Sequence, residues 1–140
     1  MQLQKAVLDS LFLFNQSPDH RLYTLVEFNH YCLFPLIHKK VQLFYDGTKP
    51  IGFVSWAWLT PDEAQNFLDE RYVPDEQAYK RPDIVTEDLQ LWGIEFIAPF
   101  GSTLKVMRGM MKYSQTVFGQ RVPVNWRRFA QPDLKHTKEL

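Results

Sequence analysis

Apolar residues recur at two spacings along the 140-residue chain, and the spacing predicts which segments are helical and which are extended. A spacing of three to four residues, typical of a helix with one buried face, dominates four segments. The expected helices span residues 3–14, about 23–37, about 60–71 and about 103–118. Short apolar runs bounded by turn residues indicate strands. The expected strands span residues 41–45, 50–59, 89–98 and 121–129.

Turn and capping residues fix several of these ends. The turn residues 46–49 separate two strands and predict a hairpin. Thr60, followed by Pro61 and Glu63, predicts a helix start with a capping box. Pro35 predicts a kink or an end in the second helix, because proline lacks the amide hydrogen that a helix needs.

Two regions carry no strong periodicity. Residues 72–88 are charged and contain two prolines, so we expect an exposed loop there. The tail from Gln131 is polar, and we expect no element in it. The remaining order is helix, helix, hairpin, helix, strand, helix, strand. It predicts one α+β domain over residues 1–140, with helices on the faces of a mixed sheet.

The spacing of apolar residues also predicts which side chains share a face in one helix and one strand. In the helix over 103–118 the buried stripe is expected to hold Leu104, Met107, Met111 and Phe118. Strand alternation over 89–98 places alternate residues on opposite faces. One face would hold Gly93, Glu95 and Ile97, and the other Trp92, Ile94 and Phe96.

Charge balance, cysteine content and the length of apolar runs argue against several classes of function. The 16 basic and 16 acidic residues cancel, so strong attraction to nucleic acid or an anionic membrane is not expected. Cys32 is the sole cysteine, which excludes an internal disulfide and favours a small buried side chain. No apolar run reaches the roughly 20 residues of a membrane span. No signal peptide is evident near the N-terminus, so we expect a cytoplasmic protein.

His20 lies in the turn segment Ser17-Pro18-Asp19-His20-Arg21 after the first helix. An imidazole titrates near neutrality and can take a proton from an attacking nucleophile. Loops often carry such sites. The competing interpretation is an exposed loop histidine beside a helix start.

Glu95 lies within an apolar strand, where a carboxylate is costly unless it is paired or hydrogen-bonded. It therefore meets solvent in a cleft or holds a buried partner. A carboxylate that orients an imidazole fits this position. A structural ion pair with an arginine such as Arg121 fits equally well.

The helix that follows this strand begins at Phe100-Gly101-Ser102, and free amides at such an end bind anions. Further along, Lys105, Arg108 and Lys112 share one helical face on which an acidic carrier protein would dock well. A plain helix start and a solvated charged face are the alternatives. Trp56 and Trp58 of the expected strand over 50–59 would either line a cleft for the acyl chain or fill the core. No metal-ligand pattern, phosphate-binding loop or nucleophile elbow is present.

Three blocks together resemble the toxin-activating lysine acyltransferases, the hemolysin-activating family that acylates RTX toxins. Residues 17–21 resemble its Ser-Pro-x-His block, and residues 50–59 its Ser-Trp-Ala strand. Residues 92–101 resemble its block ending in Ile-Ala-Pro-Phe-Gly. The blocks keep the family's order and spacing over roughly residues 5 to 125.

The resemblance implies an acyl-CoA N-acyltransferase-like (GNAT-like) fold and transfer of a fatty acyl group from acyl carrier protein to internal lysines of an RTX protoxin. It implies no cofactor, action in the cytoplasm and a possible homodimer. The family's catalytic histidine falls on His20, and its aspartate on Glu95, which is one methylene longer. The substrate-binding positions that it implies, or that the patterns above indicate, are Ser17, Ser55, Trp56, Gly101, Ser102 and Arg121.

Two other functions remain open. The longer carboxylate, and a tail that differs from the family's, favour a non-catalytic relative that binds the toxin or the carrier. A small-molecule acyl-CoA N-acyltransferase is the other, although the usual CoA-binding glycine signature is absent.

Overall fold

The computed structural model describes residues 2–120, 122–127 and 135–139, the last of these by backbone alone. The helices are α1 (Leu3–Gln16), α2 (Leu25–Phe28), the π-helical segment η1 (Asn29–Leu33), α3 (Phe34–Ile37), α4 (Pro61–Leu68), α5 (Glu76–Lys80) and α6 (Thr103–Phe118). The strands are β1 (Val41–Asp46), β2 (Lys49–Leu59), β3 (Gln90–Ile97), β4 (Pro123–Arg127) and β5 (Lys135–Glu139).

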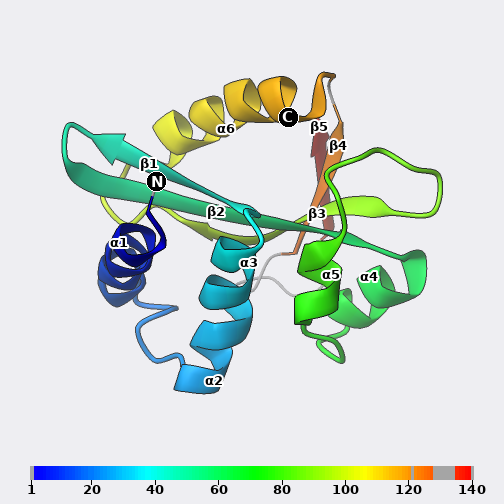
Figure 1. Cartoon of the computed structure of the whole chain (residues 1–140), viewed down its shortest axis with the longest axis horizontal. Helices are drawn as coiled ribbons and strands as arrows, with labels where there is room; N and C mark the ends of the chain where they lie inside the picture. The colour runs from blue at the N-terminus through cyan, green and yellow to red at the C-terminus, as the bar shows by residue number, and fades with distance from the viewer. Residues whose placement is uncertain (1, 121, 128–134, 140) are drawn as a thin grey trace.

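The strands form one mixed sheet in the order β1-β2-β3-β4-β5. All neighbouring pairs are antiparallel except β3 and β4, which run parallel. Helix α6 covers one face of the sheet, and α1 to α5 cover the other (Figure 1). The predicted α+β class is confirmed, as are the hairpin of β1 and β2 and the central place of β3.

The side chains of β2 alternate between two cores. Phe53 and Ala57 pack toward the helices α1 to α5, whereas Val54, Trp56 and Trp58 pack toward α6. All five are buried. The sheet therefore separates an α6 side from a side that carries the other helices, and this division decides which residues can meet.

The second expected helix is one helical run with a π-turn inside it. It begins after Thr24, whose side chain forms a capping box with Glu27. The amide of Phe34 donates to the carbonyl of Asn29, one residue further back than in an α-helix. Pro35 follows directly and is buried. The expected disruption thus takes the form of a wider turn before the proline, and the run continues to Ile37.

The expected loop over residues 72–88 is wrong in part, because α5 lies within it. Asp75 caps this helix by accepting a hydrogen bond from the amide of Ala78. Ala78 and Tyr79 are fully buried. The helix forms because these two side chains fill the core, although two apolar residues give no visible period. The tail also differs from expectation, since β5 pairs with β4.

Helix α6 spans the expected residues, but its buried face is turned from the expected one. Val106, Met110 and Ser114 are buried, whereas Leu104 is 70 % exposed. Met107, Met111 and Phe118 lie at the margin of the same core. A close approach explains the rotation, because a methyl group on Gly52 of β2 would collide with Val106.

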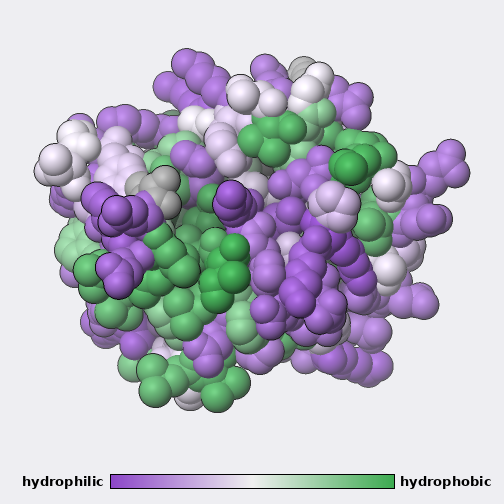
Figure 2. Space-filling view, viewed as in Figure 1, coloured by the Kyte–Doolittle hydropathy of each residue, from purple (hydrophilic) through white to green (hydrophobic). Residues whose placement is uncertain are grey.

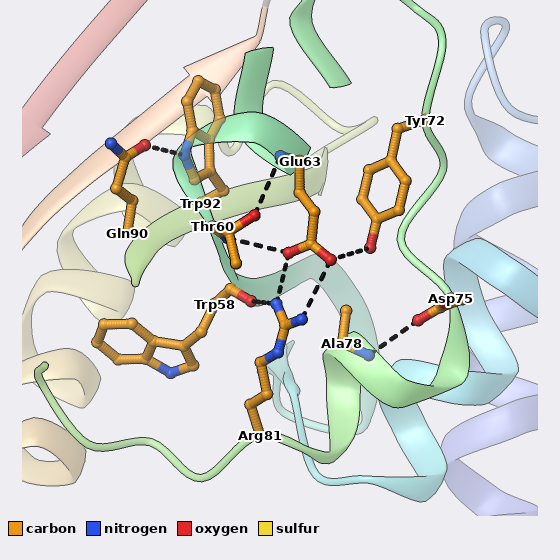
Figure 3. A network of polar contacts seen from close by, with 9 residues as sticks. All are labelled: Trp58, Thr60, Glu63, Tyr72, Asp75, Ala78, Arg81, Gln90 and Trp92. Atoms are coloured by element: carbon orange, nitrogen blue, oxygen red, sulfur yellow. Dashed lines mark hydrogen bonds and ion pairs between the residues drawn. The ribbon is translucent and has the colours of Figure 1, made fainter. Parts of the chain in front are cut away.

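An arginine ties α4 and α5 to the end of β2 (Figure 3). Thr60 and Glu63 form the predicted capping box at the start of α4. The Glu63 carboxylate also accepts two hydrogen bonds from Arg81, at 2.6 and 3.1 Å. The same guanidinium donates to the carbonyl of Trp58, at 2.6 Å. Two helices and the end of a strand are thereby joined through one ion pair.

No helix among the described residues is both long enough and apolar enough to cross a membrane.

Candidate functional site

Strand β3 contains one more residue than β2 at the centre of their pairing. Phe96 pairs with Val54, and Gly93 pairs with Trp56. Two residues of β3 therefore stand opposite a single residue of β2. This two-to-one arrangement is a β-bulge, which breaks strict alternation and redirects side chains.

The two residues are Ile94 and Glu95, and they oppose Ser55. Ile94 packs in the core toward α4 and α5, and Glu95 also points toward the helices α1 to α5. The expected alternation, with these two on opposite faces, is wrong because of the bulge. The Ser55 hydroxyl accepts a hydrogen bond of 3.0 Å from the Glu95 amide. The backbone group that the bulge displaces is thus satisfied by a side chain.

Glu95 holds a buried partner. Its Oε2 lies 2.5 Å from Nε2 of His20, and its Oε1 accepts a hydrogen bond of 2.7 Å from the Tyr23 hydroxyl. Glu95 is 2 % exposed and the His20 side chain 11 % exposed. Both carboxylate oxygens are paired, as a buried charge requires. The predicted contact between the His20 imidazole and the Glu95 carboxylate is confirmed.

A compact turn after α1 delivers the histidine. The amide of His20 donates to the carbonyl of Ser17, and the amide of Tyr23 donates to the carbonyl of His20. The Ser17 hydroxyl lies 2.6 Å from Nδ1 of His20. Because the carboxylate can only accept, Nε2 carries the proton and Nδ1 is left with a lone pair for the serine. The result is a serine, a histidine and a glutamate joined in one chain of hydrogen bonds.

Aromatic side chains fix the imidazole. Phe14 of α1 meets His20 edge to face, at 5.5 Å between ring centroids. The Tyr23 ring packs against the imidazole at 5.2 Å and against Phe14 at 5.9 Å, so the three rings form one cluster. These contacts leave the imidazole little freedom to leave the carboxylate, while a small part of it still faces solvent.

Burial keeps the neighbouring phenols in their neutral form. It raises the pKa of Tyr23, and the negative charge of Glu95 raises it further. Burial also raises the pKa of Tyr31, which packs against Tyr23. Tyr23 therefore stays a hydrogen-bond donor to the carboxylate throughout the physiological pH range.

The structure brings some of the predicted site residues together and leaves others apart. Ser17 and Ser55 contact the pair directly. Trp56 does not, because it is buried on the α6 side, where its indole donates to Asp83. Arg121 lies outside the described residues.

Gly101 and Ser102 lie at the start of α6, and the Ser102 hydroxyl donates to the carbonyl of Ile51. Both line a groove of about 870 Å³ between the β1–β2 hairpin and α6. The predicted basic face, formed by Lys105, Arg108 and Lys112, is exposed and lines the same groove. His20 and Glu95 do not line it.

Tyr23 is the site residue that the sequence patterns missed. Its signal was the spacing of three residues from His20, which is the span of a single turn. The described residues contain no group of three histidine, cysteine, aspartate or glutamate side chains able to hold a metal ion.

Comparison with curated proteins gives no significant match. Comparison with protein families does: the model of the HlyC family, described as RTX toxin acyltransferase, matches residues 2–136. The match includes the turn that carries His20 and the bulge that carries Glu95. The chain belongs to the RTX toxin acyltransferase family.

Proposed function

We propose that this protein transfers a fatty acyl group from acyl carrier protein to the ε-amino group of internal lysines on an RTX protoxin. Family membership supports acyl transfer in RTX toxin activation. The observation that carries the proposal to this chain is the hydrogen-bonded series of Ser17, His20 and Glu95. Such a series is what nucleophile activation needs, because a base is held in one orientation by a carboxylate.

His20 acts as the general base through Nδ1. Glu95 holds the Nε2 proton, so the lone pair of Nδ1 points toward Ser17. As the lysine nitrogen bonds to the thioester carbonyl carbon, its proton passes to Nδ1, with the Ser17 hydroxyl as relay. The tetrahedral intermediate then breaks its carbon–sulfur bond, and the departing thiolate takes that proton from the imidazolium.

A covalent route uses the same atoms. Either the Ser17 hydroxyl or the His20 imidazole attacks the thioester carbonyl, and the carbon–sulfur bond breaks as the carrier thiol leaves with the proton that the enzyme group gives up. The lysine amine then attacks the acyl-enzyme, and the bond from the acyl carbon to Ser17 or His20 breaks as the amine proton returns to that group. The short distance from the Ser17 hydroxyl to Nδ1 of His20, 2.6 Å, supports this second route, because a base in contact with a hydroxyl can activate it. Incubation with acyl carrier thioester alone, followed by intact-mass measurement, separates the routes, because only the covalent one adds an acyl mass.

The charge on α6 supports an acidic carrier as the donor. Lys105, Arg108 and Lys112 are exposed along one face, and the described residues give none of them an ion pair. The groove beside them reaches Phe100, which stacks on Phe12 of α1. Two residues further along α1, Phe14 touches His20. A carrier on α6 would thus lie beside the contact of Phe100 with Phe12 of α1, the helix that leads into the His20 turn.

We also propose that no cofactor takes part, because the thioester itself supplies the activated acyl group. Action in the cytoplasm and a homodimer stay predictions from the family resemblance. Light scattering of the purified protein measures the oligomeric state directly.

The experiment that tests the proposed function is acylation of a protoxin fragment by purified protein and acyl carrier thioester. We expect His20→Ala to lower turnover by about 10²–10⁴-fold, the usual contribution of a general base. His38→Ala is the matched control, since His38 also contacts a glutamate, Glu76, at 3.1 Å. If His20→Ala acylates at the parental rate, the mechanism is wrong.

A second candidate function is a non-catalytic relative that binds the toxin or the carrier. The near-complete burial of Glu95 and His20 favours it, since a structural pair would be buried in the same way. The same experiment decides between them. A parental protein that binds the protoxin fragment and adds no acyl mass would establish this candidate.

A further inference from the structure

We propose that Tyr23 is a positioning residue for acyl transfer, which holds the Glu95 carboxylate in the one orientation that serves His20. This inference rests on the proposed function. Tyr23 acts through Glu95, and no step of the chemistry passes through its hydroxyl.

The two carboxylate oxygens have separate partners. Oε2 faces His20 and Oε1 faces Tyr23, at 2.5 and 2.7 Å. A carboxylate held at one oxygen can rotate about its last carbon–carbon bond, because that torsion is broad. With both oxygens held, rotation would break one of two hydrogen bonds to a buried charge. Tyr23 therefore sets the plane in which Glu95 meets the imidazole.

A glutamate carboxylate needs the second hydrogen bond, from Tyr23, more than an aspartate carboxylate would. Its side chain has one more rotatable bond between the strand and the carboxylate. The backbone end is fixed by the bulge, where the Glu95 amide donates to Ser55. The far end is fixed by Tyr23. Together the two contacts fix the side chain at both ends.

Tyr23 is itself held in place. Its amide donates to the carbonyl of His20, so both residues belong to one turn. Its ring packs against Phe14 at 5.9 Å and Tyr31 at 5.4 Å. The same turn thus presents two donors, three residues apart, to a single carboxylate. Because burial raises the pKa of Tyr23, the phenol remains a donor near neutral pH.

The test compares Tyr23→Phe with Tyr79→Phe. Each removes one buried phenol oxygen on the same side of the sheet, but the Tyr79 hydroxyl has no hydrogen-bond partner among the described residues. We expect Tyr23→Phe to lower kcat by about tenfold or more, with KM for the acyl donor little changed. The Tm should also fall, because Oε1 of a buried carboxylate loses its donor. Tyr79→Phe should keep the parental kcat. A parental kcat in Tyr23→Phe overturns the proposal.

A double-mutant cycle separates positioning from general damage. In a Glu95→Gln background the carboxylate is absent, so Tyr23→Phe should cause no further loss of kcat. If instead the two losses multiply, Tyr23 acts independently of Glu95, and the proposal is wrong.

A measurement without substrate keeps this inference distinct from the proposed function. The His20 Nε2 proton, held between imidazole and carboxylate, should give a downfield NMR resonance in the parental protein and in Tyr79→Phe. In Tyr23→Phe it should move upfield or be lost to solvent exchange. An unchanged resonance overturns the positioning role even if the parental protein transfers no acyl group.

Discussion

At the scale of single residues, the length of Glu95 is matched to its surroundings. The bulge sets where its backbone lies, and two donors on one turn set where its carboxylate lies. The family pattern has an aspartate at this position, which is one methylene shorter. In this chain a shorter side chain would draw the carboxylate back by about one carbon–carbon bond, ~1.5 Å.

We therefore predict that Glu95→Asp, although it restores the family residue, lowers kcat. The shortened carboxylate cannot keep both hydrogen bonds, and a misplacement of about 1 Å can cost about 10²-fold. Steady-state acylation of the protoxin fragment measures it. Glu87→Asp makes the same change at an exposed loop position and should leave kcat unaltered. A Glu95→Asp enzyme as fast as the parental one would show that reach is not limiting.

Sequence reasoning located part of this site and missed the rest. His20 and Glu95 stood out by residue type and place in the chain, and the family resemblance then gave them roles together with Ser17. Tyr23 was missed although it lies one turn from His20. The contact of Ser55 with the Glu95 amide was missed because it depends on the bulge. A bulge cannot be recognised in the sequence of an apolar strand, because apolar side chains are found on both faces of a strand that is buried on both sides.

At the scale of elements, strong local signals predicted well and weak ones did not. The capping box at Thr60 and the long amphipathic helix α6 formed where expected. The short helix α5 was missed, because two buried residues and the ion pair beyond its end stabilise it. Tertiary contacts of that kind are invisible in a window of five residues.

The Glu63–Arg81 pair should make stability depend on pH. The hydrogen bonds from Arg81 lower the pKa of the Glu63 carboxyl below its ordinary value of 4.5. The stabilisation is therefore present above about pH 4.5 and is lost as the pH falls through the lowered pKa. We predict that Glu63→Gln lowers the Tm at pH 7, and that the deficit shrinks toward pH 3.

Thermal melts across this pH range measure the effect. Asp62→Asn is the matched control, because it removes a carboxylate from the same first turn of α4 but from an exposed position. Equal and pH-independent deficits in the two variants would contradict the assignment to the ion pair.

At the scale of the whole molecule, zero net charge conceals a strong asymmetry. No acidic residue occurs between Glu95 and Asp133, although this stretch contains six lysines and arginines. The remainder of the chain is correspondingly acidic. The view in Figure 2 shows hydrophilic side chains gathered over the α4 and α5 side, and apolar ones over α1 and α2. The basic stretch includes all of α6, on the opposite face of the sheet.

This asymmetry predicts how the carrier binds. The double variant Lys105→Glu/Arg108→Glu should weaken binding of acyl carrier protein by about tenfold or more and flatten its dependence on salt. Fluorescence anisotropy with labelled carrier measures both. Arg71→Glu/Lys80→Glu reverses two exposed charges elsewhere and should bind as the parental protein does. Equal weakening in both double variants would exclude α6 as the docking face.

The extra residue in β3 also bears on how a relative of this protein would lose its activity. Deleting one residue between Gly93 and Phe96 would let β2 and β3 pair without interruption. The sheet would become more regular, and a single residue, either Ile94 or Glu95, would stand opposite Ser55. A descendant that kept the isoleucine there would keep the architecture and lose the carboxylate that pairs with His20, so a strand one residue shorter and without an acidic residue at this point would identify such a relative.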